Sequence, residues 1–438
     1  MAICIPPLVV RLAGFEVVQS LPGVGAVIKA TGIDHLAPEL EAIIFGMGVV
    51  AAAFLLSWAA EVAEREVSAA LALAAVALIA VLPEYAVDLY FAWQAGQEAR
   101  AGVPFEEMTY VHYATANMTG ANRLLVGMAW PLVAFLWWLQ ARQPLRLERG
   151  VSLELLAMLA ATLYAFTIPV KRSIAWWDGL VLVGMFAFYL YLTSRLPRRE
   201  PELMGPAKAI ASLPTGRRRV AIVGIFLFSA AMILSSAEPF AEGLLEVGRQ
   251  LGVSEFIMVQ WIAPLASESG EILVAALLTI RGDAVAGMMV LVSSKVNQWT
   301  LLVGTLPFAY SISAGSLLNL PLDARQAEEI WLTAAQSLLA VAVLVRLNMT
   351  AWGALLLFVL WATQLGFTST TARFIYIFIY LAASVVLMLA EPARLRDAVR
   401  LVPLAVQTVR QPETAHALGG GADSAPAPSG QNPPPHSV

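Results

Sequence analysis

The sequence contains little charge and almost no cysteine, and both shortages limit what the protein can be. Only 13% of the 438 residues are charged, compared with about 25% in typical soluble domains, whereas 59% are hydrophobic. Cys4 is the single cysteine, which excludes an intrachain disulfide and a multi-cysteine metal site. The net charge of −4 is too small to indicate a nucleic-acid partner. These features are typical of a polytopic membrane protein.

Histidine is also scarce, with four residues in the chain, and their positions weigh against an enzyme. A hydrolase in the membrane needs a nucleophile with a base, or a metal-binding triad. No histidine is expected at the centre of a span, there is no His-Glu-x-x-His motif, and Ser267 and Ser269 have no histidine partner. We therefore expect neither enzymatic activity nor a bound cofactor.

Long apolar runs are what the sequence has in abundance. A spanning helix needs about 20 mainly apolar residues, and eleven stretches satisfy this requirement. They lie near residues 42–62, 67–93, 109–139, 152–170, 176–194, 220–243, 255–280, 284–312, 328–346, 350–367 and 371–391. We expect an all-α, multi-pass protein of the plasma (inner) membrane. Residues 1–41 are expected to form an interfacial segment, because prolines interrupt their apolar pieces.

Lysine and arginine indicate the orientation of these spans. When the N-terminus is placed outside, the basic residues concentrate in the inside segments. The densest group lies in 195–219, which is therefore predicted to be a cytoplasmic linker between a first repeat, 42–194, and a second, 220–370. The span at 371–391 is then an addition. Residues 392–438 are predicted to be basic at first and disordered from Gln411 onward, where Pro, Gly, Ala and Ser dominate.

The two halves resemble each other at three places in the same order. One match pairs Glu84 with Glu271, and another pairs Gly127 with Gly304. The aligned stretches are LLSWAAEVAE (55–64) with ILSSAEPFAE (233–242), AVLPEYAVDLYFA (80–92) with ASESGEILVAALL (266–278), and RLLVGMAWP (123–131) with TLLVGTLP (300–307). With five spans in each half, the second repeat enters the membrane from the opposite side. Such an inverted repeat is typical of secondary transporters, whose site lies at the midplane.

Each repeat places a carboxylate beside a residue that disturbs a helix. In the first repeat Pro83 precedes Glu84, and Asp88 lies four residues later on the same helix face. In the second repeat Gly270 precedes Glu271. Proline and glycine permit a kink or break that frees backbone carbonyls. Because a charge inside the membrane is costly, these acids are expected to bind a cation or to line a cavity.

Other polar side chains on the same spans and on the next span of each repeat complete a candidate site. Carboxylate, hydroxyl and amide oxygens together suit a hard cation such as Ca²⁺. One ammonium, Lys295, is expected among them; we hypothesise that it pairs with Glu268 or Glu271 as a tethered cation when no ion is bound. The alternative is that Lys295 reaches the interface and contacts nothing. The remaining candidates are Ser267, Asn117, Asn122, Ser294 and Asn297.

These motifs resemble the calcium/cation antiporter superfamily, whose sodium/calcium exchanger membrane region contains two inverted α-repeats. LPEYAVD (82–88) matches the Pro-Glu helix of that family, and ANMTGAN (116–122) matches the Asn-rich motif that follows it. The second repeat keeps Glu271 and a small-polar pattern that ends at Gly304. The resemblance implies ten core helices, with Glu84 and Glu271 as central ligands. It also implies antiport of Ca²⁺ or another cation against Na⁺ or H⁺.

The chain departs from the family pattern in ways that affect the choice of ion. Val81 and Leu82 replace a hydroxyl residue before the Pro-Glu pair, and Ala275 replaces another after Glu271. Loss of hydroxyls weakens Na⁺ sites, whereas the addition of Asp88, Glu268 and Lys295 favours proton or charge-pair chemistry. A sodium/proton exchanger with the same carboxylates is the alternative, and a membrane scaffold or receptor is a weaker one. The partners that this implies are inorganic cations and the lipid bilayer.

Overall fold

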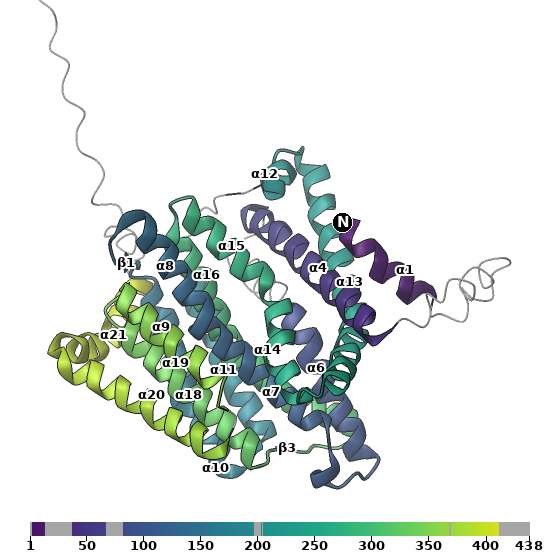
Figure 1. Cartoon of the computed structure of the whole chain (residues 1–438). Helices are drawn as coiled ribbons and strands as arrows, with labels where there is room; N and C mark the ends of the chain where they lie inside the picture. The colour runs from purple at the N-terminus through teal and green to yellow at the C-terminus, as the bar shows by residue number, and fades with distance from the viewer. Residues whose placement is uncertain are drawn as a thin grey trace, which may run out of the picture.

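The computed structural model describes residues 2–13, 37–66, 82–196, 203, 205–367 and 369–410, which form a bundle of long helices (Figure 1). The first half consists of η1 (Ala2–Cys4), α1 (Ile5–Ala13), α4 (Pro38–Glu66), α6 (Leu82–Arg100), η2 (Phe105–Glu107), α7 (Tyr110–Leu124), a π-helical segment (Leu125–Ala129), α8 (Trp130–Ala141), β1 (Leu145–Arg146), α9 (Val151–Ala165), α10 (Ile168–Lys171), β2 (Ser173–Ile174) and α11 (Trp176–Thr193).

The second half repeats this order and then extends it. It consists of α12 (Gly205–Ala211), α13 (Thr215–Leu251), α14 (Glu255–Ser267), α15 (Ser269–Ile280), α16 (Ala284–Asn297), a π-helical segment (Gln298–Leu302), α17 (Val303–Ala314), β3 (Leu320–Pro321), α18 (Ala324–Leu344), β4 (Asn348–Met349), α19 (Ala351–Gln364), α20 (Thr370–Ala390) and α21 (Pro392–Arg410). The elements α20 and α21 have no counterpart in the described part of the first half.

Among the described residues, seven helices are long and apolar enough to cross a membrane, or eight if the bent pair α14–α15 is one span. The other three predicted spans are not among these helices. The span 67–93 is described only from Leu82. The segment from α16 to α17 has a lower hydropathy because it contains Lys295, Asn297 and Gln298. The helix α19 is short, at 14 residues.

Two very short antiparallel sheets confirm the inverted relation of the repeats. At one end β1 pairs with β4, and at the other β2 pairs with β3, so each sheet joins a loop of one repeat to a loop of the other. The pairing is symmetric in detail. The carbonyl of Leu347 accepts from Leu147 N at 2.7 Å, and the carbonyl of Arg172 accepts from Leu322 N at 2.9 Å. Both acceptor residues have a left-handed backbone, with φ of 53° at Leu347 and 55° at Arg172.

The predicted match between Gly127 and Gly304 is also seen in the packing. A β-carbon on Gly127 would lie 2.1 Å from the Trp361 side chain on α19, and one on Gly304 would lie 3.1 Å from the backbone oxygen of Gly179 on α11. Because α19 and α11 are equivalent helices of the two repeats, each glycine permits the same close approach to a helix of the other half.

The helices that carry the predicted site residues pack against one another. Contacts join α6 to α7 and α17, α14 to α7, and α15 to α16 and α4. The pair α4 and α13 lies side by side at one edge of the bundle, with α1 beside it (Figure 1). Both predicted repeats therefore contribute to a common interior.

The predicted linker and the predicted C-terminal segment contain helices that were not expected from the sequence, and other predicted segments lie outside the described residues. The linker 195–219 contains α12 and the start of α13. The basic segment after residue 391, for which no helix was expected, forms α21 up to Arg410. Residues 14–36, 67–81 and 411–438 lie outside the described residues, and with them most of the predicted interfacial segment 1–41 and the predicted disordered tail; the end of that segment, from Pro38, already belongs to α4.

Candidate cation site

The first repeat contributes two fully buried carboxylates from one helix turn. Glu84 and Asp88 lie on α6 and are 1% and 0% exposed. Pro83, directly before Glu84, lies in the first described turn of α6.

In the second repeat the predicted helix break is found, two residues before the expected glycine. The helices α14 and α15 are bent by 50° at Glu268, which separates them. The carbonyl of Pro264 accepts from Glu268 N at 2.9 Å and from Ser267 Oγ at 3.2 Å. Gly270 has a packing role instead, because a β-carbon there would lie 3.2 Å from Ala53 on α4. Glu271 is in the first turn of α15.

The carboxylates of the two repeats lie in one electrostatic environment. Glu84 interacts with Glu271, Glu268 and Asp88, and Glu268 interacts with Glu271 and Asp88. Each repeat adds a neutral polar neighbour, with Asn117 of α7 beside Asp88 and Ser294 of α16 beside Glu271. Repulsion among so many buried acids is relieved by protons or by a bound cation.

Many oxygen atoms of this group have no hydrogen-bond partner among the described residues. Buried polar atoms in proteins are nearly always bonded, so a concentration of unpartnered ones marks a place that water or a ligand can fill. Carboxylate, amide and hydroxyl oxygens are the donor set of a hard cation. The unpartnered atoms are both carboxylate oxygens of Glu84 and of Asp88, Oδ1 of Asn117, Oε2 of Glu268, Oε2 of Glu271, Oγ of Ser294 and Oε1 of Gln298.

The acids do not form a closed cage by themselves. In the described part of the chain, no three Asp, Glu, His or Cys side chains are close enough to hold one metal ion. A transported cation must therefore also use neutral oxygens, or draw the carboxylates together when it enters. Either behaviour suits a transport site, which has to release its ion.

Lys295 is fully buried and takes neither of the positions expected for it. Its Nζ donates to Asn122 Oδ1 at 2.7 Å and to the Asn122 carbonyl at 3.2 Å, and it lies 4.6 Å from the ring centre of Trp299. Among the described ion pairs, none joins Lys295 to Glu268 or Glu271. Instead Gln298 Nε2 donates to Glu268 Oε1 at 3.1 Å.

Two predicted site residues, Asn122 and Asn297, already accept a hydrogen bond at their side-chain oxygen. Asn122 accepts from Lys295, while its Nδ2 donates to the Met118 carbonyl at 2.8 Å. Asn297 Oδ1 accepts from the Tyr85 hydroxyl at 3.1 Å, which links α16 to α6. The sequence motifs did not single out Gln298, although it follows Asn297 in the polar run SSKVNQ; it begins the π-helical segment and is fully buried.

Comparison with known proteins gives a consistent picture. The family model described as "Sodium/calcium exchanger protein" matches residues 41–195 and 221–370. The crystal structure of the H⁺/Ca²⁺ exchanger CAX is similar, with 45% sequence identity and a TM-score of 0.81, over 92% of this chain and 98% of that one. A search of curated proteins found no match.

Two more distant structures share the fold. Native YfkE has 12% identity and a TM-score of 0.56, over 82% of this chain and 97% of that one. The sodium-calcium exchanger NCX_Mj, soaked with Na⁺ and Sr²⁺, has 17% identity and a TM-score of 0.50, over 76% of this chain and 100% of that one. The resemblance inferred from the sequence motifs is thus confirmed, together with the inverted-repeat fold. The chain belongs to the sodium/calcium exchanger family of membrane cation antiporters.

Proposed function

We propose that this chain exchanges Ca²⁺ for H⁺ by alternating access, at a site centred on Glu84 and Glu271. The observation that carries the proposal is the group of buried oxygens without hydrogen-bond partners, which both repeats supply. A carboxylate from each repeat can balance a divalent ion, and neutral oxygens can complete its coordination. The similar structure of CAX is described as that of an H⁺/Ca²⁺ exchanger, which supports the same pair of ions here.

Protons suit this site better than Na⁺ as the counter-ion. Sodium depends on neutral oxygens, and hydroxyls are missing at Leu82 and Ala275, where the family pattern has them. Asp88 and Glu268 instead add proton-binding groups. When Ca²⁺ leaves, buried carboxylates are best stabilised by protonation, so one group of residues can carry either ion in turn.

Lys295 is proposed to limit how many cations the site can hold. Its ammonium occupies a fixed place on α16, where Asn122 of the other repeat holds it. While it is charged, an ammonium at this place competes with a second transported cation. This is a proposed role for the tethered cation, supported by its complete burial and by its electrostatic interaction with Glu268.

The remaining residues are proposed to play supporting parts. Asn117 and Ser294 are proposed as neutral ligands, since their oxygens are unpartnered beside Asp88 and Glu271. Ser267, Asn122 and Asn297 already form hydrogen bonds, so we propose that they line the path or position other groups. The protein is proposed to act in the plasma (inner) membrane, without enzymatic activity or a bound cofactor.

Ion flux in proteoliposomes tests the proposal. Purified protein in neutral-lipid vesicles should take up Ca²⁺ when an outward H⁺ gradient is imposed. An imposed Ca²⁺ gradient should change the lumenal pH, with alkalinisation when Ca²⁺ enters and acidification when Ca²⁺ leaves. A Na⁺ gradient of the same size should drive little Ca²⁺ uptake. Strong Na⁺-driven Ca²⁺ flux would contradict H⁺ as the counter-ion. Sodium-driven H⁺ flux without Ca²⁺ flux would establish the sodium/proton alternative.

A further inference from the structure

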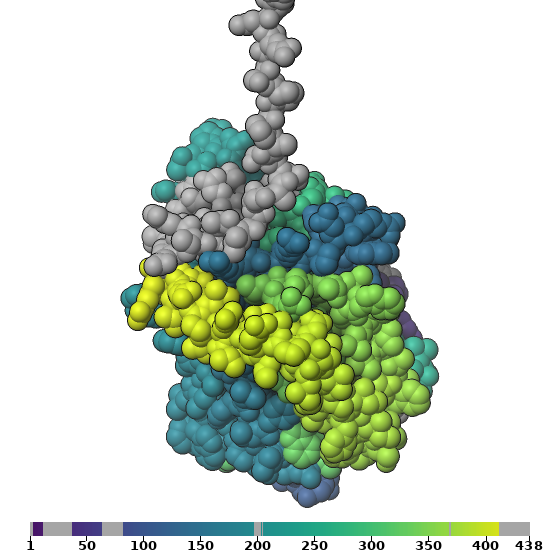
Figure 2. Space-filling model, turned by 90° about the vertical axis from the view of Figure 1, so that its left-hand side faces the viewer, coloured from purple at the N-terminus to yellow at the C-terminus, as the bar shows by residue number. Residues whose placement is uncertain are grey.

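The last helix of the described residues, α21, lies across the outside of the bundle (Figure 2) and is held in a fixed orientation. Its first turn is anchored by Arg394, whose Nη1 donates to the carbonyls of Ala342 at 3.0 Å and Val343 at 3.1 Å near the end of α18. The carboxylate of Glu391 forms one ion pair with Arg394, at 3.2 Å, and another with Arg346, at 2.8 Å. These contacts determine which faces of α21 point away from the protein.

Three kinds of side chain occupy separate faces of α21. The buried face, formed by Arg394, Leu401, Ala405 and Thr408, packs against the bundle. An exposed apolar stripe follows helical spacing, because its members are three or four residues apart. The stripe consists of Leu395, Val399, Val402 and Val406, of which Val399 is 72% exposed. The exposed arginines are Arg396, Arg400 and Arg410.

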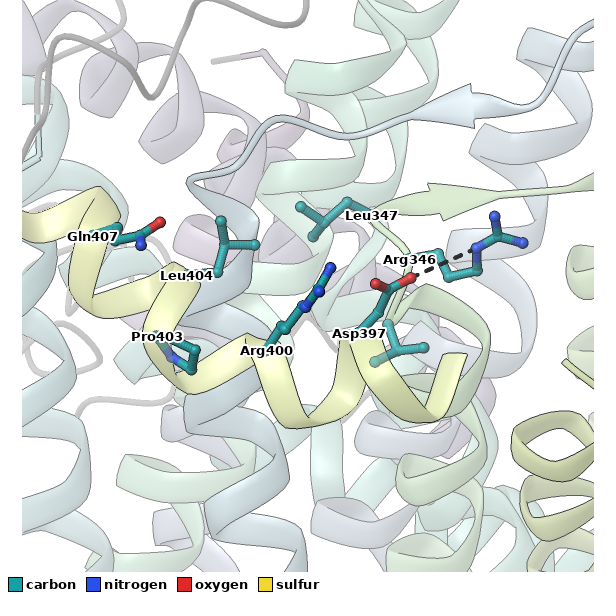
Figure 3. A pocket seen from close by; sticks show the side chains of 8 residues that line it. Arg346, Leu347, Asp397, Arg400, Pro403, Leu404 and Gln407 are labelled. Atoms are coloured by element: carbon teal, nitrogen blue, oxygen red, sulfur yellow. Dashed lines mark ion pairs between the residues drawn. The ribbon is translucent and has the colours of Figure 1, made fainter. Parts of the chain in front are cut away.

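A groove lies on the basic side of α21. It has a volume of about 520 Å³ and separates α21 from the segment that follows α18. In Figure 3, Arg400 and Gln407 point into it, while Asp397 lies toward Arg346. Asp397 and Arg346 form an ion pair at 3.8 Å. Arg400 has no hydrogen bond or ion pair with any described residue, so its guanidinium is available to a ligand. The lining residues are Val345, Arg346, Leu347, Asp397, Arg400, Pro403, Leu404 and Gln407.

The surroundings of the groove add further positive charge. Leu347, which lines the groove, accepts a backbone hydrogen bond from Leu147 in the loop between α8 and α9. This loop contains Arg146 and Arg149 and one acid, Glu148, so its net charge is positive. A ligand that fills the groove should therefore be anionic. The adjacent apolar stripe indicates that the same ligand has hydrocarbon chains, since an amphipathic helix of this kind lies in a membrane interface.

We propose that α21 and the groove bind an anionic phospholipid. The acyl chains lie along the apolar stripe, and the phosphate is held by Arg396 and Arg400 at the edge of the groove. Guanidinium groups form paired hydrogen bonds with phosphate oxygens, so arginine suits this contact better than a simple point charge. The anionic lipids of the cytoplasmic leaflet attract such basic helices. The proposal does not depend on which ions the protein transports.

Lipid binding to the full-length protein tests the proposal without any measurement of transport. Native mass spectrometry can count phosphatidylglycerol and phosphatidylcholine molecules on the detergent-solubilised protein during a titration. Wild type should retain phosphatidylglycerol preferentially. The variant R396Q/R400Q should bind it about 25-fold more weakly, because each arginine contributes roughly a fivefold effect and the two effects multiply. The matched control R100Q/R172Q, which removes two exposed arginines elsewhere, should bind like wild type.

A second variant distinguishes a lipid from a soluble phosphate compound. Val399→Ser with Val402→Ser keeps both arginines and removes part of the apolar stripe. It should also weaken phosphatidylglycerol binding, while monodispersity and melting temperature stay those of wild type. The proposal is overturned if wild type binds both lipids equally, or if R396Q/R400Q and its control bind alike. It is also overturned if the serine variant keeps full affinity and glycerol phosphate competes with the lipid, because the groove would then hold a soluble anion.

Discussion

The backbone of Gly120 on α7 lies directly against the carbonyl of Gln260 on α14. A β-carbon at position 120 would be 1.8 Å from that oxygen, which no side-chain rotation can relieve. This contact brings the helix that carries Asn117 close to the helix that ends at Glu268. Small residues at such crossings are the usual means by which helices approach in lipid.

Gly120→Ala should therefore destabilise the protein by more than the 1–3 kcal/mol that is typical of overpacking, because backbone atoms must move. The melting temperature in detergent should fall clearly. Gly184→Ala on α11 is the matched control, since no atom lies within 4 Å of its β-carbon position. That variant should be as stable as wild type or slightly more stable, as alanine favours a helix. Equal stability of both variants would contradict the close contact.

Replacement of the central carboxylates should abolish transport without unfolding the protein. Glu84→Gln and Glu271→Gln preserve size but remove the charge that balances a divalent cation. Each variant should lose at least about 100-fold in Ca²⁺ flux, a change of roughly 2.7 kcal/mol in activation free energy. Glu107→Gln, at an exposed acid of η2, should transport normally. Flux near the wild-type rate in either site variant would remove that residue from the site.

The prominence of these two acids shows what could be predicted from sequence. A carboxylate in an apolar span is conspicuous because lipid excludes charge, and its repetition at matched places indicates a shared function. The same reasoning found the repeats, which the symmetric sheets and glycine contacts confirm. It also anticipated a break in the span 255–280, although the break lies at Glu268 and Gly270 packs against α4.

Other features depend on contacts that a linear pattern does not specify. Lys295 and Asn122 are far apart in the chain and come together only because the repeats interlock. Gln298 looks like any polar residue of its run until its hydrogen bond to Glu268 is known. The helix α21 has too many arginines to resemble a span, and it is joined to the bundle by Arg394 in its first turn, which also pairs with Glu391 directly before the helix.

A buried ion network ties the additional helix α20 to the core. Glu329 of α18 contacts Arg123 Nη2 of α7 at 2.6 Å and Arg373 Nε of α20 at 2.9 Å. Glu329→Gln leaves two buried guanidinium groups without this counter-charge, and loss of one member of a buried pair costs about 3–5 kcal/mol. The melting temperature should drop sharply. Glu246→Gln breaks an exposed pair with Arg249, which is worth at most about 1 kcal/mol, and should change it little. A similar small drop in both variants would show that the network is dispensable.

Lys295 provides the most direct test of how the site chooses its ions. Its ammonium is fully buried, is held by Asn122 and interacts electrostatically with Glu268. Lys295→Asn removes this charge and supplies a neutral amide in its place. With the competing charge gone, Ca²⁺ should bind more tightly, which lowers KM, and Na⁺ should begin to affect the rate. The pH profile of transport should move to higher pH, because carboxylates without a positive neighbour retain protons more tightly. Lys208→Asn, which removes an exposed lysine of α12, is the control and should change none of these properties. If a stably folded Lys295→Asn variant kept the Ca²⁺ KM, the Na⁺ response and the pH profile of wild type, Lys295 would have no role in coupling.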